Sequence, residues 1–481
     1  MEKFIDRQME MAELNRLLAN PGGQLIPVYG RRRVGKTTLL LHWAEQAQRP
    51  TLYWVARRET AEASRHSLAR TLWAWAYPDL QNPEPPRFDS WEMLFREMAR
   101  MLSDKPSIVI LDEFPYIVES DASFPSHLQA AWDHLFKNKP IFFVLAGSHI
   151  GMMVDMMAYN SPLHGRFTAQ MPVDALPFAA LREYFPNYDA AERVATYAVL
   201  GGIPAYLEHF NPHANLGTNI REHLFRRTGM FRSEPDILVS DLVRETRVYE
   251  SVLRSIANDL HTPADIAVET GIPAQNLPPY LKRLGELRLI ERRTPATIPT
   301  TQRKTTTRSR YHVRDPYLRF YFRFIEPNQE MIEMGLVEPL WERIAEQFRA
   351  FIGATTFEEL CREWVVTQAH IRQLPFMPEV VGSHWAADAQ IDVVALNWRE
   401  KIILLGECKW GTDAVGRSVI QELFDKTSKV VPGSDWKVYY AFFARAGFTA
   451  AARQAAEEVG ALLVDLKKLD VDLLAALNRS S

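Results

Sequence analysis

The segment Gly30–Thr37 is the first group of residues that could do chemistry, because it matches the phosphate-binding loop GxxxxGK[ST] in full. In such a loop backbone N–H groups surround the phosphates, the lysine pairs with the β- and γ-phosphates, and the last hydroxyl binds Mg²⁺. The spacing therefore predicts a site for ATP and Mg²⁺. The residues expected there are Gly30, Arg33, Val34, Gly35, Lys36, Thr37 and Thr38, with Thr37 on the metal.

A second part of this site is expected where two further apolar runs end. The run Ser107–Leu111 is followed by Asp112 and Glu113. Asp112 is placed to hold Mg²⁺, and Glu113 to orient or deprotonate the attacking water, although it also fits a solvated acid at a strand end. The run at 140–146 ends in Gly147-Ser148, so Ser148 could sense the γ-phosphate, or the pair could form only a turn.

A separate group of chemical residues lies near the other end of the chain, at Asp392, Glu407 and Lys409. We expect strands at 389–397 and 401–410, and residues i and i+2 of a strand share a face, so Glu407 and Lys409 point the same way. Two carboxylates suit Mg²⁺ or Mn²⁺, which would activate water near a phosphate. Lys409 would position the nucleophile or stabilise negative charge.

The elements around the first site agree with its motif. An apolar strand at 24–29 leads into the loop, and a helix is expected at 38–48, which gives the required strand–loop–helix order. Pro27 is unusual there, because proline cannot donate to a central ladder.

The middle of the chain has the order of a winged helix. We expect helices at 248–260, from Thr262-Pro263 onward and at 276–287, followed by a strand at 289–293. The third helix carries only Lys282 and Arg283 as cations, so a purely structural role is an equal alternative. The basic segment Thr294–Arg310 fits a wing that touches phosphates, an exposed hairpin tip or a flexible linker.

Bulk composition sets further limits. The 481 residues carry a net charge of −3, so nucleic-acid binding requires local patches. The two cysteines match no zinc or disulfide spacing, which favours a cytoplasmic protein. We infer no membrane span, because no apolar stretch approaches twenty residues.

The motifs of the first 230 residues together resemble the archaeal-type ATPase family, a branch of the AAA+/STAND P-loop ATPases. The matching segments are Phe4–Arg7, Tyr29–Thr37, Leu111–Phe114, Ala146–Ser148, Pro162–Arg166 and Gly201–Pro204. The resemblance implies ATP hydrolysis and makes Arg166 a γ-phosphate sensor or an interface arginine. From the residue alone, a surface salt bridge is favoured. The family usually has tyrosine where His164 stands.

The second constellation resembles the PD-(D/E)xK nuclease superfamily. This resemblance implies an acidic metal ligand on an upstream helix, for which we favour Glu358, and a supporting polar residue on the following helix, Gln421. Ile391 replaces the proline of the motif. Two alternatives stay open: a domain that keeps the fold without cutting, and accidental alternation in an ordinary strand.

We therefore predict an α/β protein with three parts: a P-loop ATPase (AAA+-like) domain with a helical lid at 1–230, a winged-helix domain at 231–305 and a restriction-endonuclease-like α/β domain at 306–481. The expected function is ATP binding and hydrolysis that control a metal-dependent DNA-binding or nuclease-like domain. The alternative is an ATP-driven signalling or binding module with an inactive C-terminal domain. Assembly into a homo-oligomer is left open.

Overall fold

The computed structural model describes residues 4–81, 84–102, 106–240 and 246–479, which form two compact units. Unit 1 contains the chain up to Leu176 together with Ile203–Ala205, and unit 2 contains Pro177–Gly202 and the chain from Tyr206 onward. Each unit has its own five-stranded sheet. The predicted boundaries at 230 and 305 both fall within unit 2, and that finer subdivision stays a prediction.

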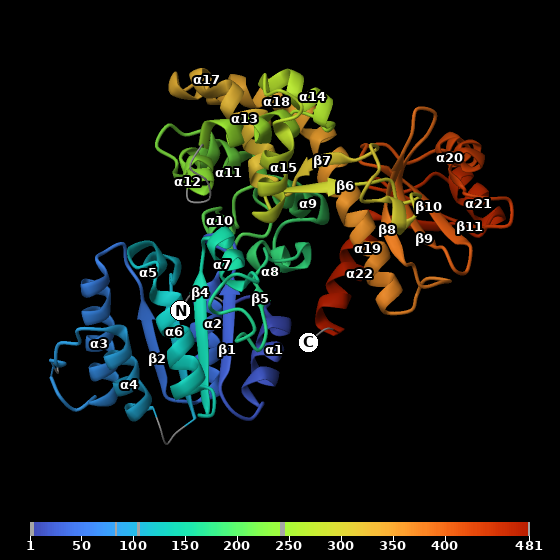
Figure 1. Ribbon diagram of the computed structural model, residues 1–481. Coiled ribbons are helices and arrows are strands. Elements are labelled where there is room, and N and C mark those ends of the chain that lie inside the picture. Colours follow the sequence, from blue (N-terminus) through green and yellow to red (C-terminus); the bar gives the residue numbers. More distant parts are fainter. Residues whose placement is uncertain (1–3, 82–83, 103–105, 241–245, 480–481) are drawn as a thin grey trace. The chain divides into compact units, whose positions relative to one another are not determined.

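The sheet of unit 1 is entirely parallel and has the order β2-β3-β4-β1-β5 (Figure 1). Because its strands are parallel, their carboxyl ends meet at one edge, where ligands of open α/β sheets bind. β4 lies between β1 and β3, so three predicted site segments end side by side. The strands are β1 Gln24–Tyr29, β2 Thr51–Val55, β3 Ser107–Asp112, β4 Ile141–Gly147 and β5 Met171–Pro172.

Burial explains why these strands read as continuous apolar runs: every residue of β1, β3 and β4 is buried. Pro27 is accommodated because its nitrogen faces the β5 side of β1. The carbonyls of Leu25 and Tyr29 point to that side, where they accept hydrogen bonds from Thr168 and Val173. β5 pairs only with Val28 and Tyr29, so the missing N–H of Pro27 removes no ladder bond.

Helices cover both faces of this sheet. Side chains of α3, α4, α5 and α6 pack with Leu52, Val109 and Phe143 on one face. On the other, Trp43 of α2 packs against Phe142 and donates a hydrogen bond to Asn15 of α1. The helices of unit 1 are α1 Gln8–Leu18, α2 Lys36–Ala47, α3 Ala61–Ala76, α4 Trp91–Met101, α5 Pro115–Ser120, α6 Phe124–Ala131, η1 Trp132–Phe136 and α7 Ile150–Met157.

The first half of unit 2 is mostly helical. α14 begins as predicted, with the Thr262 hydroxyl capping Asp265 N–H and Pro263 in the first turn, and it ends at Gly271 with φ +68°. The principal elements are α8 Leu181–Tyr184, α9 Ala190–Leu200, α11 Leu216–Asn219, α12 Glu234–Ser240, α13 Thr246–Ala257, α14 Pro263–Thr270, α15 Leu277–Glu286, β6 Ile290–Arg293, β7 Arg310–Val313, α16 Pro316–Phe320, η6 Tyr321–Ile325, α17 Gln329–Glu333, α18 Val337–Ile352 and η8 Gly353–Phe357. α10 Pro204–Leu207 spans the division between the units.

The basic segment between β6 and β7 is held against β8. Ala296 N–H donates to Ser383 O at 2.8 Å, and Trp385 Nε1 donates to Arg308 O at 3.1 Å. Arg303 donates to the carbonyls of Ala296 and Ile298, so its charge is used within the segment itself. These contacts argue against the flexible-linker alternative.

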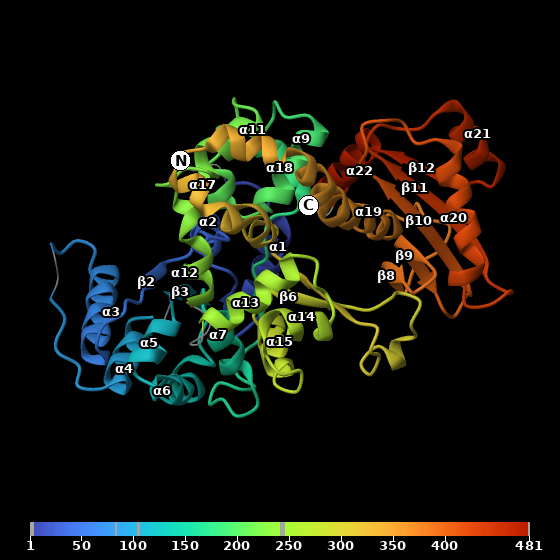
Figure 2. The ribbon, with the colours of Figure 1, turned by 90° about the horizontal axis from the view of Figure 1, so that it is seen from above.

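The C-terminal sheet of unit 2 is mixed, with the order β12-β11-β10-β9-β8. β10, β11 and β12 are parallel, whereas β8, β9 and β10 are antiparallel. α20 and α21 cover one face and α19 and α22 the other (Figure 2). The elements are α19 Glu358–His370, β8 Val380–Trp385, β9 Gln390–Asn397, β10 Ile402–Lys409, α20 Arg417–Val430, β11 Lys437–Ala444, α21 Ala450–Glu458, β12 Leu462–Asp465 and α22 Leu466–Arg479.

Among the described helices, none is both long and apolar enough to span a membrane.

Candidate functional sites

Lys36 is the centre of the first site. Its ammonium is buried and donates to Gly30 O at 3.0 Å, Arg31 O at 3.1 Å and Ser148 Oγ at 3.0 Å. Burial lowers the pKa of Lys36 to about 8, although the nearby carboxylates of Glu113 and Asp112 act in the opposite direction. An ammonium held this way can exchange its neutral partners for phosphate oxygens.

Asp112 joins the loop to β3. Thr37 Oγ1 donates to Asp112 Oδ2 at 2.6 Å, and Tyr53 OH donates to the same oxygen at 3.1 Å. Hydroxyl and carboxylate oxygens therefore meet where Mg²⁺ was predicted, and oxygen is the ligand type that this ion prefers. Burial and the charge of Asp112 raise the pKa of Tyr53, so the phenol stays a donor.

Glu113 and Ser148 complete this cluster. Ser148 Oγ donates to Glu113 Oε1 at 3.0 Å while it accepts from Lys36. Glu113 has φ +50°, an uncommon left-handed value for a residue other than glycine. Strain of this kind persists where surrounding structure enforces it and is enriched at functional sites. Lys36, Ser148 and Glu113 thus form one hydrogen-bonded chain.

The rest of the loop is fixed by close packing. A Cβ atom on Gly30 would lie 2.2 Å from Val173 O, and Gly35 has φ +91°, so both positions favour glycine. Arg33 has φ +68°, and Val34 is buried. Thr38 lies exposed in the first turn of α2.

Two contacts of this site were not found from the sequence as site features. Arg7, with φ +77°, is buried and donates to Val34 O at 2.8 Å, so the Phe4–Arg7 motif supports the loop from below. Tyr53 reaches Asp112 from β2, a strand that was not predicted, although its run of aromatic and branched residues is a signal that could have revealed it. Pro204 packs near Gly35, where its Cγ would lie 3.7 Å from a Cβ atom added to that glycine.

Arg166 is not brought to this cluster. Its guanidinium pairs with Asp133 of η1 at 3.0 Å and donates to His164 O at 2.9 Å. η1 precedes β4 and packs beside Gly23, at the end of the sheet opposite the phosphate loop. A salt bridge was the interpretation favoured from the residue alone, and the role of an interface arginine stays a prediction.

The second site is built around an irregularity in β9. Between Gly382 and His384 of β8, β9 advances from Val394 to Ile391, which places one extra residue in β9. Such a bulge re-aims side chains and is frequent beside active sites. Asp392 lies in it, and its Oδ2 accepts the N–H of Cys408 at 2.9 Å, beyond the last paired residues of β9 and β10.

Glu407 and Lys409 share a face of β10 as predicted, with Lys409 Nζ 2.7 Å from Glu407 Oε1. The contact with this carboxylate raises the pKa of Lys409 against the opposing effect of burial. Lys426 of α20 approaches the other oxygen of Glu407 at 3.5 Å. Lys426 was not predicted from the sequence. Gln421, which was predicted as a supporting polar residue, donates its amide N–H to Asp425 on the exposed side of α20.

Glu358 begins α19 and lies in the electrostatic neighbourhood of Asp392. Burial, followed by the charge of Asp392, raises the pKa of Glu358 to about 8, and burial, followed by Glu407, raises that of Asp392 to about 6. Arg362 donates to Asp392 O at 2.9 Å and lies 3.5 Å from Glu358. The structure thus places three acids in one charged neighbourhood.

The donors of this site suit a hard divalent cation, because they are carboxylate oxygens held in a buried place where a cation would relieve their repulsion. Within the described ranges, however, no three His, Cys, Asp or Glu side chains are grouped closely enough to hold a metal ion. Instead of a metal ion, Lys409 and Lys426 pair with the carboxylate of Glu407. The metal ligands Glu358, Asp392 and Glu407 therefore stay predictions.

The two cysteines of the chain meet beside these acids. The thiols of Cys361 on α19 and Cys408 on β10 interact, and burial raises the pKa of both. Their sequence positions gave no indication of this proximity, because it depends on how α19 packs on the sheet.

Comparison with known proteins finds two family models that each match part of the chain. Residues 4–210 match an "ATPase domain predominantly from Archaea", and residues 321–420 match "Archaea bacterial proteins of unknown function". The structure is similar to that of the Walker-type ATPase PABY2304 of Pyrococcus abyssi, with a TM-score of 0.50 and 21% identity, over 67% of this chain and 97% of that one. This likeness supports the P-loop fold.

A curated relative covers nearly the whole chain. The uncharacterized protein MJECL04 of Methanocaldococcus jannaschii is 32% identical over 441 residues, which are 91% of this chain and 94% of that protein. The chain therefore belongs to the family of this archaeal protein, and it carries an ATPase domain of the type found predominantly in Archaea.

Proposed function

We propose that ATP binding and hydrolysis in unit 1 control a metal-dependent, DNA-directed site in unit 2. The observation that supports turnover most directly is the connected chain Lys36–Ser148–Glu113 beside the Thr37–Asp112 pair. In this chain, Lys36 would bind phosphate, Thr37 with Asp112 would bind the metal, and Glu113 would act on the attacking water, all at one edge of the sheet.

In this proposal each residue of unit 1 has one task. Lys36 would pair with the β- and γ-phosphates, and Thr37 with Asp112 would hold Mg²⁺, which neutralises charge on the transferred phosphoryl group. Glu113 would orient the attacking water or accept its proton. Ser148, which already bonds to both Lys36 and Glu113, would report the γ-phosphate to the carboxylate.

In unit 2 the bulge at Asp392 and the alternation of β10 support a phosphodiester-directed site. Asp392 and Glu407, with Glu358, would hold Mg²⁺ or Mn²⁺, which lowers the pKa of bound water. Lys409 would stabilise the negative charge that develops on the phosphate. α15 would be the DNA-reading helix of the winged-helix segment.

A second candidate is a nucleotide-controlled binding or signalling module with an inactive C-terminal domain. Two observations favour it. Lys409 and Lys426 both approach Glu407. The two cations of α15, Lys282 and Arg283, lie 3.7 and 3.4 Å from Glu286, which reduces the charge that they offer to DNA.

The test is a cleavage assay on single-stranded, duplex and branched DNA and on RNA, with Mg²⁺ or Mn²⁺, with and without ATP. ATPase activity is measured in the same preparation. Glu113→Gln should bind ATP but lower turnover by about 10² to 10⁴-fold, the usual contribution of a general base. Asp392→Ala should keep ATPase activity and lose metal-dependent cleavage.

Matched controls are Glu45→Gln, an exposed acid of α2, and Asp413→Ala, an exposed acid that follows β10. Both should behave like the parent. Cleavage that persists in Asp392→Ala would disprove the assignment of the second site. Absent cleavage with a working ATPase would favour the second candidate, and an unchanged ATPase in Glu113→Gln would remove the role given to that carboxylate.

A further inference from the structure

We propose that a cavity of unit 2, beside Glu358 and Asp392, binds the phosphate group of a nucleotide, either free or at the end of a DNA strand. The cavity has a volume of about 400 Å³ and is lined by residues of α13, β6, β7, α16, η6, α18, η8, α19, β8 and β9. This volume lies near the low end of the range for small-molecule pockets, roughly 300–1,000 Å³. It therefore suits one nucleotide and is too small for a duplex.

The wall of this cavity is rich in guanidinium groups. Five arginines contribute to it: Arg293, Arg310, Arg319, Arg323 and Arg362. Guanidinium groups present planar, paired donors that match carboxylate and phosphate oxygens, so a concentration of them in a cavity indicates an anionic ligand.

The acids of the wall do not use all of this donor capacity. Arg293 and Arg319 share the carboxylate of Glu359, at 2.6 Å from Arg293 and at 2.8 and 3.0 Å from Arg319, and Arg293 also pairs with Glu291, which is not part of the cavity lining. Arg310 lies over the ring of Trp385 at 5.0 Å, and the described residues place no acid within ion-pair distance of it. An anion in the cavity would be the natural partner of Arg310.

Two buried nitrogens of the lining also lack partners. Arg319 Nε and His384 Nε2 form no hydrogen bond with any part of the chain that the structure describes, and these side chains are only 7% and 6% exposed. Thr297 Oγ1 lies 2.7 Å from His384 Nδ1, so when the hydroxyl donates there, Nε2 carries the proton. Buried donors are normally satisfied, and a bound oxyanion would satisfy them.

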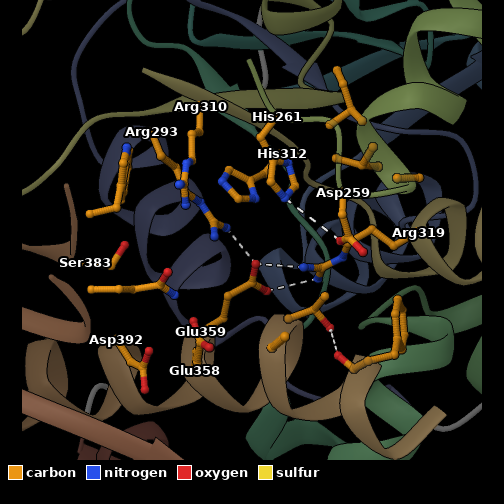
Figure 3. Close-up of a pocket in the computed structure, with 18 of the residues that line it drawn as sticks. Asp259, His261, Arg293, Arg310, His312, Arg319, Glu358, Glu359, Ser383 and Asp392 are labelled. Carbon is orange, nitrogen blue, oxygen red and sulfur yellow. Dashed lines mark hydrogen bonds and ion pairs between the residues drawn. The ribbon is translucent and has the colours of Figure 1, made fainter. Parts of the chain in front are cut away.

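The histidines of the cavity are consistent with a positive environment. His261 and His312 stack with ring centroids 4.2 Å apart. Burial, followed by the charges of Arg293 and His261, lowers the pKa of His312 to about 2, and burial lowers that of His261. Both rings are therefore neutral at physiological pH. Figure 3 shows them with Arg293 and Arg310 on one side of the cavity, with Glu358 and Asp392 on the other.

The juxtaposition of these two walls indicates which anion is bound. Asp392 would repel a simple anion, whereas a nucleotide phosphate accompanied by a divalent cation is matched by arginines on one side and by the carboxyl groups of Asp392 and Glu358 on the other. The identity of the ligand as a nucleotide rests on the proposed function of unit 2. The presence of an anion site rests on the arginines alone.

The experiment measures binding of fluorescent single-stranded DNA by the full chain in which Lys36→Ala disables the phosphate loop. Ca²⁺ is present to supply the divalent cation that the carboxylates would share with the phosphate. Gel electrophoresis of the recovered strands verifies that they are uncut. Two strands of one sequence are compared, with a 5′-phosphate or a 5′-hydroxyl. The phosphorylated strand should bind about tenfold more tightly, the effect of one charge-assisted hydrogen bond. Arg310→Gln and Arg323→Gln should each remove most of that advantage.

Both arginines are partly exposed, and among the described residues Arg323 forms an ion pair only with the exposed Asp259. These variants should therefore fold, and thermal unfolding verifies this. Arg453→Gln, at an exposed position of α21, is the matched control and should keep the advantage.

Displacement of the strand by dTMP would assign the site to free nucleotides as well, and failure of dTMP to compete would assign it to strand ends. Equal affinity for the two strands, or an advantage kept in both variants, would overturn the proposal. An advantage without any cleavage by the unmodified chain would leave this site standing while the nuclease function fails.

Discussion

Lys36 gives the ATP site a pH dependence that can be measured. Burial lowers the pKa of its ammonium to about 8, and bound phosphates would raise it again. Above pH 8, ATP binding should therefore take up a proton, and affinity should fall with rising pH by up to about tenfold per pH unit. Calorimetry at pH 7 and pH 9, in buffers of different ionisation enthalpy, measures both effects.

Lys36→Arg is the control, because its guanidinium stays charged over this range and its affinity should be weaker but independent of pH. The same shift affects folding. Since the unfolded lysine titrates near 10.4, the unfolded chain binds more protons between pH 8 and that value, and the contribution of Lys36 to stability should rise with pH there. An affinity of the parent that is equal at pH 7 and pH 9 would contradict the assigned pKa.

At the residue scale, the sequence predicted the groups that a motif fixes locally. Lys36, Thr37, Asp112 and Glu113 lie together because loop and strand ends follow directly from apolar runs. Lys426, which approaches Glu407 across two elements, was missed because nothing in its local pattern marks it. Contacts of that kind depend on how α20 packs on the sheet.

At the element scale, substitution of a glycine by alanine tests how closely other atoms approach the backbone there. They approach closely in the phosphate loop, but not in the helix α15. Gly30→Ala would place a methyl group 2.2 Å from Val173 O, and Val173 N–H is itself bonded to Tyr29 O at 2.7 Å. Because the backbone must move, we expect the free energy of unfolding to fall by about 1–3 kcal/mol and ATP binding to weaken. Differential scanning calorimetry and nucleotide titration measure these effects.

Gly285→Ala is the opposite case. Gly285 lies in α15, and a Cβ atom there would meet nothing within 4 Å. Because alanine is a better helix former than glycine, the free energy of unfolding of this variant should rise by about 0.5–1 kcal/mol, and ATP binding should be unchanged. Destabilisation by Gly285→Ala equal to that by Gly30→Ala would show that packing around the phosphate loop is not the cause.

The sequence predicted β1, β3, β4, β9 and β10 to within a residue or two, because buried strands are continuous apolar runs, but it did not predict β2, β5, β8, β11 or β12. It did not predict the bulge at Asp392, since one extra residue in a strand leaves no signature in the alternation of so short a segment. It also left the fate of 294–310 open, because hydrogen bonds to β8 involve partners more than seventy residues away.

At the scale of the whole molecule, two units with separate sheets carry separate candidate sites. The sequence predicted three parts, and the boundaries at 230 and 305 both lie within unit 2, so that finer subdivision stays a prediction. Helices before and after the hairpin β6–β7 belong to the same unit as the C-terminal sheet. A signal from ATP must then act through a difference between nucleotide states, since a nucleotide with equal affinity for both forms shifts nothing.

Coupling between ATP binding and DNA binding must be reciprocal, whichever residues transmit it. If ATP changes the affinity for DNA by some factor, DNA must change the affinity for ATP by the same factor, and couplings of this kind typically amount to about 5–150-fold. We expect both ratios to agree when measured with Glu113→Gln, in which ATP should persist. DNA affinity is measured by fluorescence anisotropy with ATP, ADP or no nucleotide, and nucleotide affinity by calorimetry with and without DNA. Asp392→Ala serves as the control, because removal of a group proposed for cleavage should leave a binding cycle closed. Equal DNA affinity in all three nucleotide states would mean that the phosphate loop does not control unit 2, and the ATPase would then need another output.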